Sequence, residues 1–164
     1  MGLGQFAYAN NSNRFLAAAP LAGQRFALVG VPFDGAVTNR PGARFGPQEI
    51  RRASLMLCDA VHPFFGVSPL DVLGDGGDMR LPNATPLPDV RRAIESAAAA
   101  LMAAHHCVFL GGDHSVTLPL LRAAHARFGL WVWCTLMPTA IPGKTISASL
   151  RGMEPGPMRR SRKA

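Results

Sequence analysis

No stretch of about eighteen consecutive apolar residues occurs in this sequence, which excludes a transmembrane helix. The first residues also lack the basic, apolar and small-residue order of a signal peptide. Cysteine is scarce: Cys58, Cys107 and Cys134 stand singly, without Cys-x-x-Cys spacing. Isolated thiols of this kind argue against a disulfide framework and against a zinc site. We therefore expect a cytoplasmic protein whose cysteines are packing residues.

Acidic residues are outnumbered, but the excess of positive charge is confined to one end of the chain. The net charge is +7, yet residues 1–128 contain eleven Lys and Arg against nine Asp and Glu, whereas residues 129–164 contain six against one. No aromatic residue interrupts the Arg-Arg-Ser-Arg-Lys cluster at residues 159–163, as base stacking would require. A solvated terminal segment is the better interpretation, so we expect neither nucleic acid nor a membrane as a partner.

What the sequence does contain is an alternation of apolar runs and helical patterns. Its 164 residues, 48% hydrophobic and 16% charged, suit one soluble domain with a real core. Residues 26–31 are a fully apolar run that favours a central parallel strand, and residues 107–110 are a second apolar run, which predicts another buried strand. Strands that alternate with helices of ordinary length predict βαβ units and a parallel sheet.

Three helices are predicted between and after these strands. The first begins at Pro47, the second at residues 85–89, which are rich in capping and first-turn residues, and the third after Ser115. The positions that recur at helical spacing are Ile50, Ser54, Leu57 and Cys58 in the first helix, Val90, Ile94, Ala97 and Leu101 in the second, and Val116, Leu120 and Ala123 in the third.

A short strand is predicted at residues 70–73, followed by a glycine-rich loop, Gly-Asp-Gly-Gly-Asp, at residues 74–78. Asp75 and Asp78 make a cation site conceivable at this loop. No third acidic residue stands in register with them, and the order of residues is not that of a dinucleotide-binding loop. We therefore prefer a simple turn.

Four basic residues receive structural interpretations. Arg51 and Arg52 are expected on the solvent face of the first helix rather than in contact with a ligand. His105 and His106 are expected at the end of the second helix, where an imidazolium suits the negative pole of the helix dipole better than it suits a metal site.

The strand at residues 107–110 ends in the most chemically suggestive stretch of the chain, Cys-Val-Phe-Leu-Gly-Gly-Asp-His-Ser at residues 107–115. Ligands bind beyond the carboxyl ends of strands in open α/β sheets, and the two glycines allow close approach. His114 is accordingly a candidate metal ligand. The alternative is a strand-to-helix turn in which Asp113 or Ser115 is the N-cap and His114 is merely exposed.

A second motif favours the interpretation of His114 as a metal ligand over that of an exposed residue in a turn. Residues 29–34 read Val-Gly-Val-Pro-Phe-Asp, and residues 38–47 read Thr-Asn-Arg-Pro-Gly-Ala-Arg-Phe-Gly-Pro. Together with residues 111–115 they resemble the ureohydrolase family, the manganese enzymes that include arginase, agmatinase and guanidinobutyrase. The sequence of residues 38–47 is more similar to the agmatinase branch than to arginase itself. The resemblance covers about residues 26–128 and implies a three-layer αβα parallel sheet that is incomplete in this chain.

The resemblance also implies a chemistry. Two manganese ions in the intact family activate a bridging hydroxide, which attacks the carbon of a linear guanidino substrate and releases urea and a primary amine. His114 matches the first-motif histidine, a ligand to one metal, and Asp113 is expected to orient the loop or to support the metal indirectly. Asn39 and Arg40 lie in a loop that borders the cleft, without an assigned role. The resemblance assigns no catalytic residue in this chain. The intact enzyme is expected to be a homo-oligomer.

The pattern of the family stops after residue 130. No Asp follows Asp113 and no His follows His125, so the family's Asp-Ala-His-x-Asp and Ser-x-Asp-x-Asp motifs are missing. We expect an amino-terminal arm at residues 1–24, part of a ureohydrolase domain at residues 25–130, and an aberrant, disordered basic tail at residues 131–164. Such a chain would bind manganese weakly and would be inactive alone.

We hypothesise that residues from about 131 onward are translated out of frame, which would account for the missing motif. The codons possible for residues 131–145, read two nucleotides on, permit Gly-Val-Val-His-Phe-Asp-Ala-His-x-Asp, in which the Ala is obligatory. The alternative functions are a non-catalytic α/β binding module that retains His114 and pairs its open sheet edge with a partner, or a relative of the guanidinobutyrase or arginase type.

Overall fold

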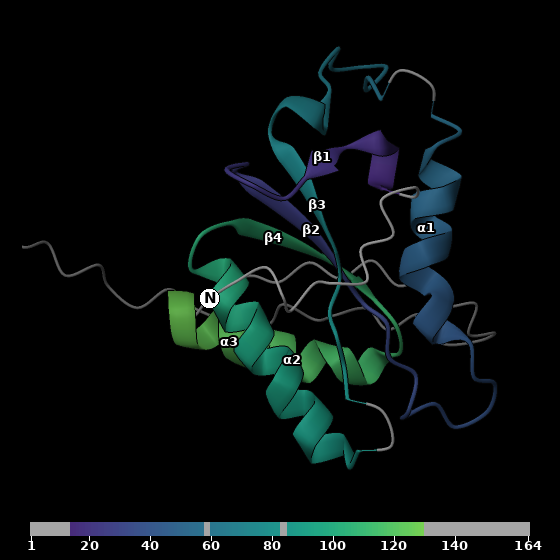
Figure 1. Cartoon of the computed structure of the whole chain (residues 1–164), viewed down its shortest axis with the longest axis vertical. Helices are drawn as coiled ribbons and strands as arrows, with labels where there is room; N and C mark the ends of the chain where they lie inside the picture. Colours follow the sequence, from purple (N-terminus) through teal and green to yellow (C-terminus); the bar gives the residue numbers. More distant parts are fainter. Residues whose placement is uncertain (1–13, 58–59, 83–84, 130–164) are drawn as a thin grey trace, which may run out of the picture. The chain divides into compact units, whose positions relative to one another are not determined.

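A computed structural model describes residues 14–57, 60–82 and 85–129. It contains a sheet of four strands in the order β1-β3-β2-β4, with every paired neighbour parallel. Helix α1 lies on one side of the sheet and helices α2 and α3 lie on the other (Figure 1). The predicted α/β fold with a parallel sheet is confirmed. The predictions for Cys58, Cys134 and the tail at residues 131–164 fall outside the described residues.

The strand β2 (Phe26–Val31) is the centre of the sheet and was predicted at the same bounds. It pairs with β3 on one side and with β4 on the other, and five of its six residues are buried. An uncharged apolar run suits this position because both faces of a central parallel strand are covered.

The strand β3 (Leu73–Asp78) corrects the prediction for this region. The strand was expected at residues 70–73, but residues 69–71 form a 3-10 turn, and the glycine-rich stretch expected to be a loop is the strand itself. A Cβ atom added to Gly74 would lie 3.0 Å from the Cα of Leu21, and one added to Gly76 would lie 3.2 Å from Leu21 Cδ2. Gly74 and Gly76 are needed because the residues before β2 pack closely on this strand, and not because the chain turns here.

Two of the predicted helices, α2 (Leu87–Met102) and α3 (Thr117–Phe128), are confirmed. The first, α1 (Gly46–Ser54), exists but ends before its predicted limit, and its orientation differs from the prediction. Ile50 is 42% exposed, whereas Arg51 is buried. The expected solvent-facing position of Arg51 is therefore wrong, and that of Arg52 is confirmed.

The strand β4 (His106–Gly111) forms as predicted but is less buried than an apolar run of this kind suggests. Its described neighbour is β2 alone, so one edge of the strand is open in the described part of the chain. Burial still raises the pKa of the Cys107 thiol to about 11, which leaves little of the reactive thiolate at neutral pH. The expected packing role of this cysteine agrees with that shift.

The expectation for His105 and His106 needs correction, because α2 ends at Met102. The Nδ1 atom of His105 lies 2.8 Å from the carbonyl oxygen of Gln24, and the ring of His106, already in β4, stacks on Phe26 with 5.6 Å between centroids. Both imidazoles tie β4 to the segment around Phe26, and neither serves the helix dipole.

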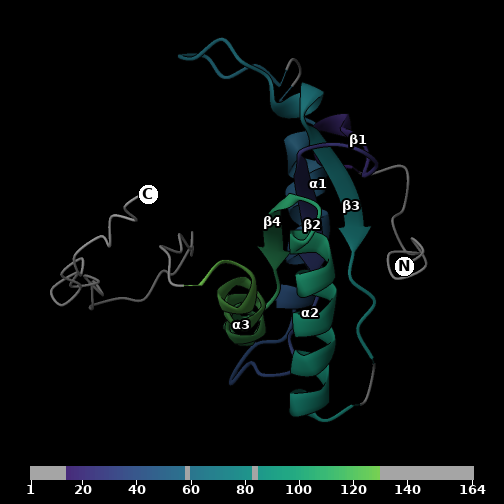
Figure 2. The same cartoon turned by 90° about the vertical axis from the view of Figure 1, so that its left-hand side faces the viewer.

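The described part of the predicted arm, residues 14–24, packs on the sheet. It contains a 3-10 turn at Phe15–Ala17 and the short strand β1 (Ala19–Pro20), which pairs with β3. Figure 2 shows β1 and β4 at opposite ends of the sheet. No helix among the described residues is long and apolar enough to cross a membrane.

Candidate active-site loops

The two sequence motifs meet at the carboxyl ends of adjacent strands. β2 leads into the loop at residues 32–45, and β4 leads into residues 112–115. The backbone N–H of Asp113 donates to the carbonyl oxygen of Phe33 at 2.7 Å. The N–H of Ala36 donates in turn to the Asp113 carboxylate at 2.9 Å. Segments almost eighty residues apart in the chain are thereby joined where α/β sheets bind ligands.

Gly112 makes this approach possible. A Cβ atom added at this position would lie 1.9 Å from the carbonyl oxygen of Phe33 and 2.7 Å from its carbonyl carbon. Those are backbone atoms, which cannot rotate away as a flexible side chain can. The glycine predicted to give close approach does so, and the group it approaches is the neighbouring loop.

Asp113 fixes the shape of its loop with both carboxylate oxygens. Oδ1 accepts from the N–H of Ser115 at 2.9 Å and from its hydroxyl, while Oδ2 accepts from Ala36. The residue also caps the 3-10 turn at His114–Val116. The N-cap interpretation thus holds for Asp113, and the loop-orienting role expected for it agrees with these contacts.

The side chain of His114 is exposed at the start of that turn. Its Nδ1 atom lies 3.4 Å from the hydroxyl oxygen of Thr117, which is a weak contact. Among the described residues no three His, Cys, Asp or Glu side chains gather as a group that could hold a metal ion. Asn39 and Arg40 are exposed in the facing loop.

Sequence reasoning gave no role to Asp34, which holds the first loop closed. The buried carboxylate accepts from the N–H of Gly42 at 2.8 Å and from Arg44 Nε at 2.9 Å, and Arg44 Nη2 lies 2.8 Å from its second oxygen. Gly42 has a φ of 135°, which is strained for any residue with a side chain. In the sequence, this contact is indicated by Asp34 at the end of a strand and by Arg44 in the loop that follows it.

Acid should weaken the contacts that Asp34 makes with Gly42 and Arg44. The Arg44 hydrogen bond, together with that from Gly42, holds the pKa of Asp34 below its ordinary value of 3.8, although desolvation opposes the shift. A carboxylate with a lowered folded-state pKa stabilises the fold above its unfolded pKa, and that stability is lost as pH falls through the folded pKa. Urea midpoints measured from pH 6 to pH 2 should therefore fall more steeply for the natural chain than for Asp34→Asn. Parallel profiles would contradict this role.

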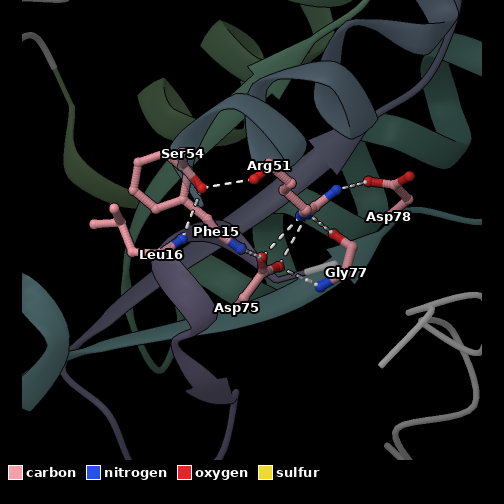
Figure 3. Close-up of polar contacts among 7 residues, drawn as sticks. All are labelled: Phe15, Leu16, Arg51, Ser54, Asp75, Gly77 and Asp78. Carbon is pink, nitrogen blue, oxygen red and sulfur yellow. Dashed lines mark hydrogen bonds and ion pairs between the residues drawn. The ribbon is translucent and has the colours of Figure 1, made fainter. Parts of the chain in front are cut away.

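A second polar cluster lies under the sheet, around Arg51 of α1 (Figure 3). Arg51 Nε and Nη2 bind the two carboxylate oxygens of Asp75 at 2.8 and 2.9 Å, and Nη1 binds Asp78 at 2.6 Å. The preferred turn interpretation for these acids is therefore wrong. The cation that Asp75 and Asp78 bind is the guanidinium of Arg51. Burial alone would lower the pKa of Arg51, but the hydrogen bonds that it donates to Asp75 and Asp78 raise it.

The same cluster anchors the residues before β1. The N–H of Phe15 donates to Asp75 at 2.8 Å. The N–H of Leu16 donates to the hydroxyl of Ser54 at 2.8 Å, and that hydroxyl donates to the carbonyl of Arg51 at 2.7 Å. The polar cluster around Arg51 thus connects α1, β3 and the start of the described chain.

Comparison with known proteins agrees with this geometry. A sequence model of the Arginase family matches residues 24–133, more than half of the chain, so the chain belongs to the Arginase family. It is 44% identical over 107 residues to mitochondrial agmatinase from Gallus gallus, covering 63% of this chain and 31% of that protein. It is 43% identical over 107 residues to mitochondrial guanidino acid hydrolase from Homo sapiens, covering 63% and 30%.

The fold has the same relatives. The chain is similar to the crystal structure of a hypothetical agmatinase from Burkholderia thailandensis, with a TM-score of 0.66 and 33% identity over 71% of this chain and 39% of that one. The resemblance to the ureohydrolase family and the fold that it implied are confirmed. The chain spans about a third of the length of the curated relatives that it matches.

Proposed function

We propose that this chain is the first part of a ureohydrolase that hydrolyses a linear guanidino compound, with agmatine giving putrescine and urea. The observation that carries the proposal is the junction of the two loops at the ends of β2 and β4, with the His114 imidazole exposed beside it. The 44% identity to an agmatinase over 107 residues supports that substrate class. A guanidino acid is the second candidate, because a guanidino acid hydrolase is 43% identical.

The family is manganese-dependent, and the donors present here fit that requirement only in part. His114 offers one imidazole, a ligand that suits manganese, whereas both oxygens of Asp113 already hold the loop. The described residues contain no group of three donors, and two metals need more than one histidine. These residues do not fit a two-metal centre, and His114 is proposed as a ligand to one metal ion only.

We further propose that residues from about 131 onward are translated out of frame. Two observations support this: the family match ends at residue 133, and the codons possible for residues 131–145 permit the missing Asp-Ala-His-x-Asp motif two nucleotides on. The remaining ligands, and the loops that would read the far end of the substrate, then lie in the unused frame. The intact protein is proposed to be a cytoplasmic homo-oligomer.

The chain as written should release no urea. Because it offers one histidine ligand where two metals must be held, agmatine, 4-guanidinobutanoate and arginine incubated with it and with added manganese should give urea at the rate of the buffer control. His114→Ala is the matched variant, since it removes the proposed ligand from an exposed position. Urea released by the natural chain and not by His114→Ala would contradict the proposed incompleteness of the site.

A further inference from the structure

Helix α1 touches both candidate-site loops at its first turn. The loop at residues 32–45 runs directly into Gly46, the first residue of the helix. A Cβ atom added to Gly46 would lie 3.2 Å from the carbonyl oxygen of Gly111, which ends β4 and precedes the loop of His114. The end of the first loop and the start of the second are thus in contact, so the place of α1 sets the distance between them.

The helix lies on the sheet without a large apolar anchor. All nine of its residues are described, and the buried ones are Pro47, Arg51 and Ser54, whereas Ile50 is 42% exposed. Hydrophobic burial therefore contributes little to the position of α1. Polar contacts must supply what it does not, and Arg51 donates to two aspartates and to the carbonyl of Gly77.

Of the two aspartates, Asp78 stands at the end of β3 that adjoins the loops. Its Oδ1 atom accepts from Arg51 Nη1 at 2.6 Å (Figure 3). A Cβ atom added to Gly30 of β2 would lie 1.8 Å from this oxygen and 2.9 Å from the Cβ of Pro47. The ion pair and the first turn of α1 therefore meet over β2, directly before the first loop begins.

We propose that Arg51 is a positioning residue for the candidate site. Its contact with Asp78 holds the first turn of α1 over the ends of β2 and β4, and this turn fixes the loop of His114 relative to the loop at residues 32–45. With a side chain that is 6% exposed, Arg51 acts through the helix and not by contact with a ligand. The inference rests on the proposed function only in taking His114 as a metal ligand.

The test is amide hydrogen exchange of the full chain, followed by NMR at urea concentrations below the unfolding transition. The reporter amides are those of Ala36 and Asp113, which donate the hydrogen bonds that join the loops. Arg51→Lys keeps the charge but loses the planar fork, and Asp78→Asn keeps the shape but loses the charge. Each variant weakens a hydrogen bond between charged groups, so protection of the reporter amides should fall at least about tenfold.

The urea dependence separates positioning from general stability. A local opening of the loops exposes little surface, so the faster exchange of the reporter amides should not depend on urea. The amides of β2, by contrast, report global unfolding. The proposal is overturned if the reporter amides keep their protection in either variant, or if they exchange with the urea dependence of the β2 amides.

Matched controls place the same substitutions at exposed positions. Arg52→Lys lies beside Arg51 on the solvent face of α1, and Asp71→Asn lies before β3, at the end away from the loops. Both should leave the reporter amides unchanged. A loss of protection in either control as large as in Arg51→Lys or Asp78→Asn would also overturn the proposal.

A second readout connects the loops to the proposed ligand. The imidazole signals of His114 should shift in Arg51→Lys and Asp78→Asn and stay in place in both controls. Unmoved signals in the two test variants would show that Arg51 does not position His114. These measurements use neither manganese nor a guanidino compound, so their outcome is separate from that of the urea assays that test the proposed function.

Discussion

Replacing Arg51 by alanine should lower the free energy of unfolding by about 3–5 kcal/mol, the usual cost of removing one partner from a buried ion pair. The side chain is 6% exposed and the side chain of Asp75 1%, so water cannot replace the lost hydrogen bonds. The Asp75 carboxylate would remain buried, with the N–H groups of Phe15 and Gly77 as its remaining partners. Denaturant unfolding followed by circular dichroism measures the difference.

Arg52→Ala is the matched control for that experiment. The neighbouring arginine pairs with Glu49 on the surface, at 72% side-chain exposure, and such a pair contributes between zero and about 1 kcal/mol. The two variants remove the same side chain from adjacent positions of one helix. Equal losses of stability in Arg51→Ala and Arg52→Ala would show that the buried cluster does not hold α1 on the sheet.

Gly112→Ala should also be strongly destabilising, by about 3 kcal/mol or more, because the added methyl group overlaps backbone atoms of Phe33. Relief requires the two loops to separate, which breaks the hydrogen bond from Asp113 to Phe33. Unfolding midpoints measure the loss, and the amide signals of Ala36 and Ser115 report the separation of the loops.

Gly23→Ala provides the comparison. This glycine is exposed, and a Cβ atom added to it meets nothing within 4 Å. The substitution should leave stability unchanged or raise it by a few tenths of a kcal/mol through the unfolded chain. If Gly112→Ala were as harmless as Gly23→Ala, the close approach of the loops would not be required by the fold.

The predictable parts of this fold are those whose local pattern and tertiary role agree. β2 is an uncharged apolar run in the middle of the sheet, and α2 buries the predicted Val90, Ile94 and Leu101, with Ala98 buried in place of the predicted Ala97. Both were predicted from period and composition alone. β3 was missed because local preference assigns Gly-Asp-Gly-Gly-Asp to a turn, whereas the tight packing of residue 21 over the strand needs glycine.

Arg51 was missed for a different reason. A charged residue is placed at the surface by default, and its burial here depends on carboxylates that lie 24 and 27 residues further along the chain. Helical periodicity contains no information about such partners. The loops were predicted better: the two motifs were expected at one site, and the structure joins them. The contact between Asp34 and Arg44 was missed, although Asp34 lies at the end of a strand and Arg44 follows in the same loop.

The most direct test of the account compares urea release by two proteins: the chain as written, and the product of the same gene with its reading frame restored at codon 131. We expect the restored protein to release urea from agmatine or 4-guanidinobutanoate when manganese is supplied, and to lose that activity on His114→Ala. The chain as written should release none. A restored frame that does not encode Phe-Asp-Ala-His would contradict the proposed slip of the reading frame. A restored protein that encodes this motif but releases no urea from either substrate would contradict the proposed hydrolysis of a linear guanidino compound.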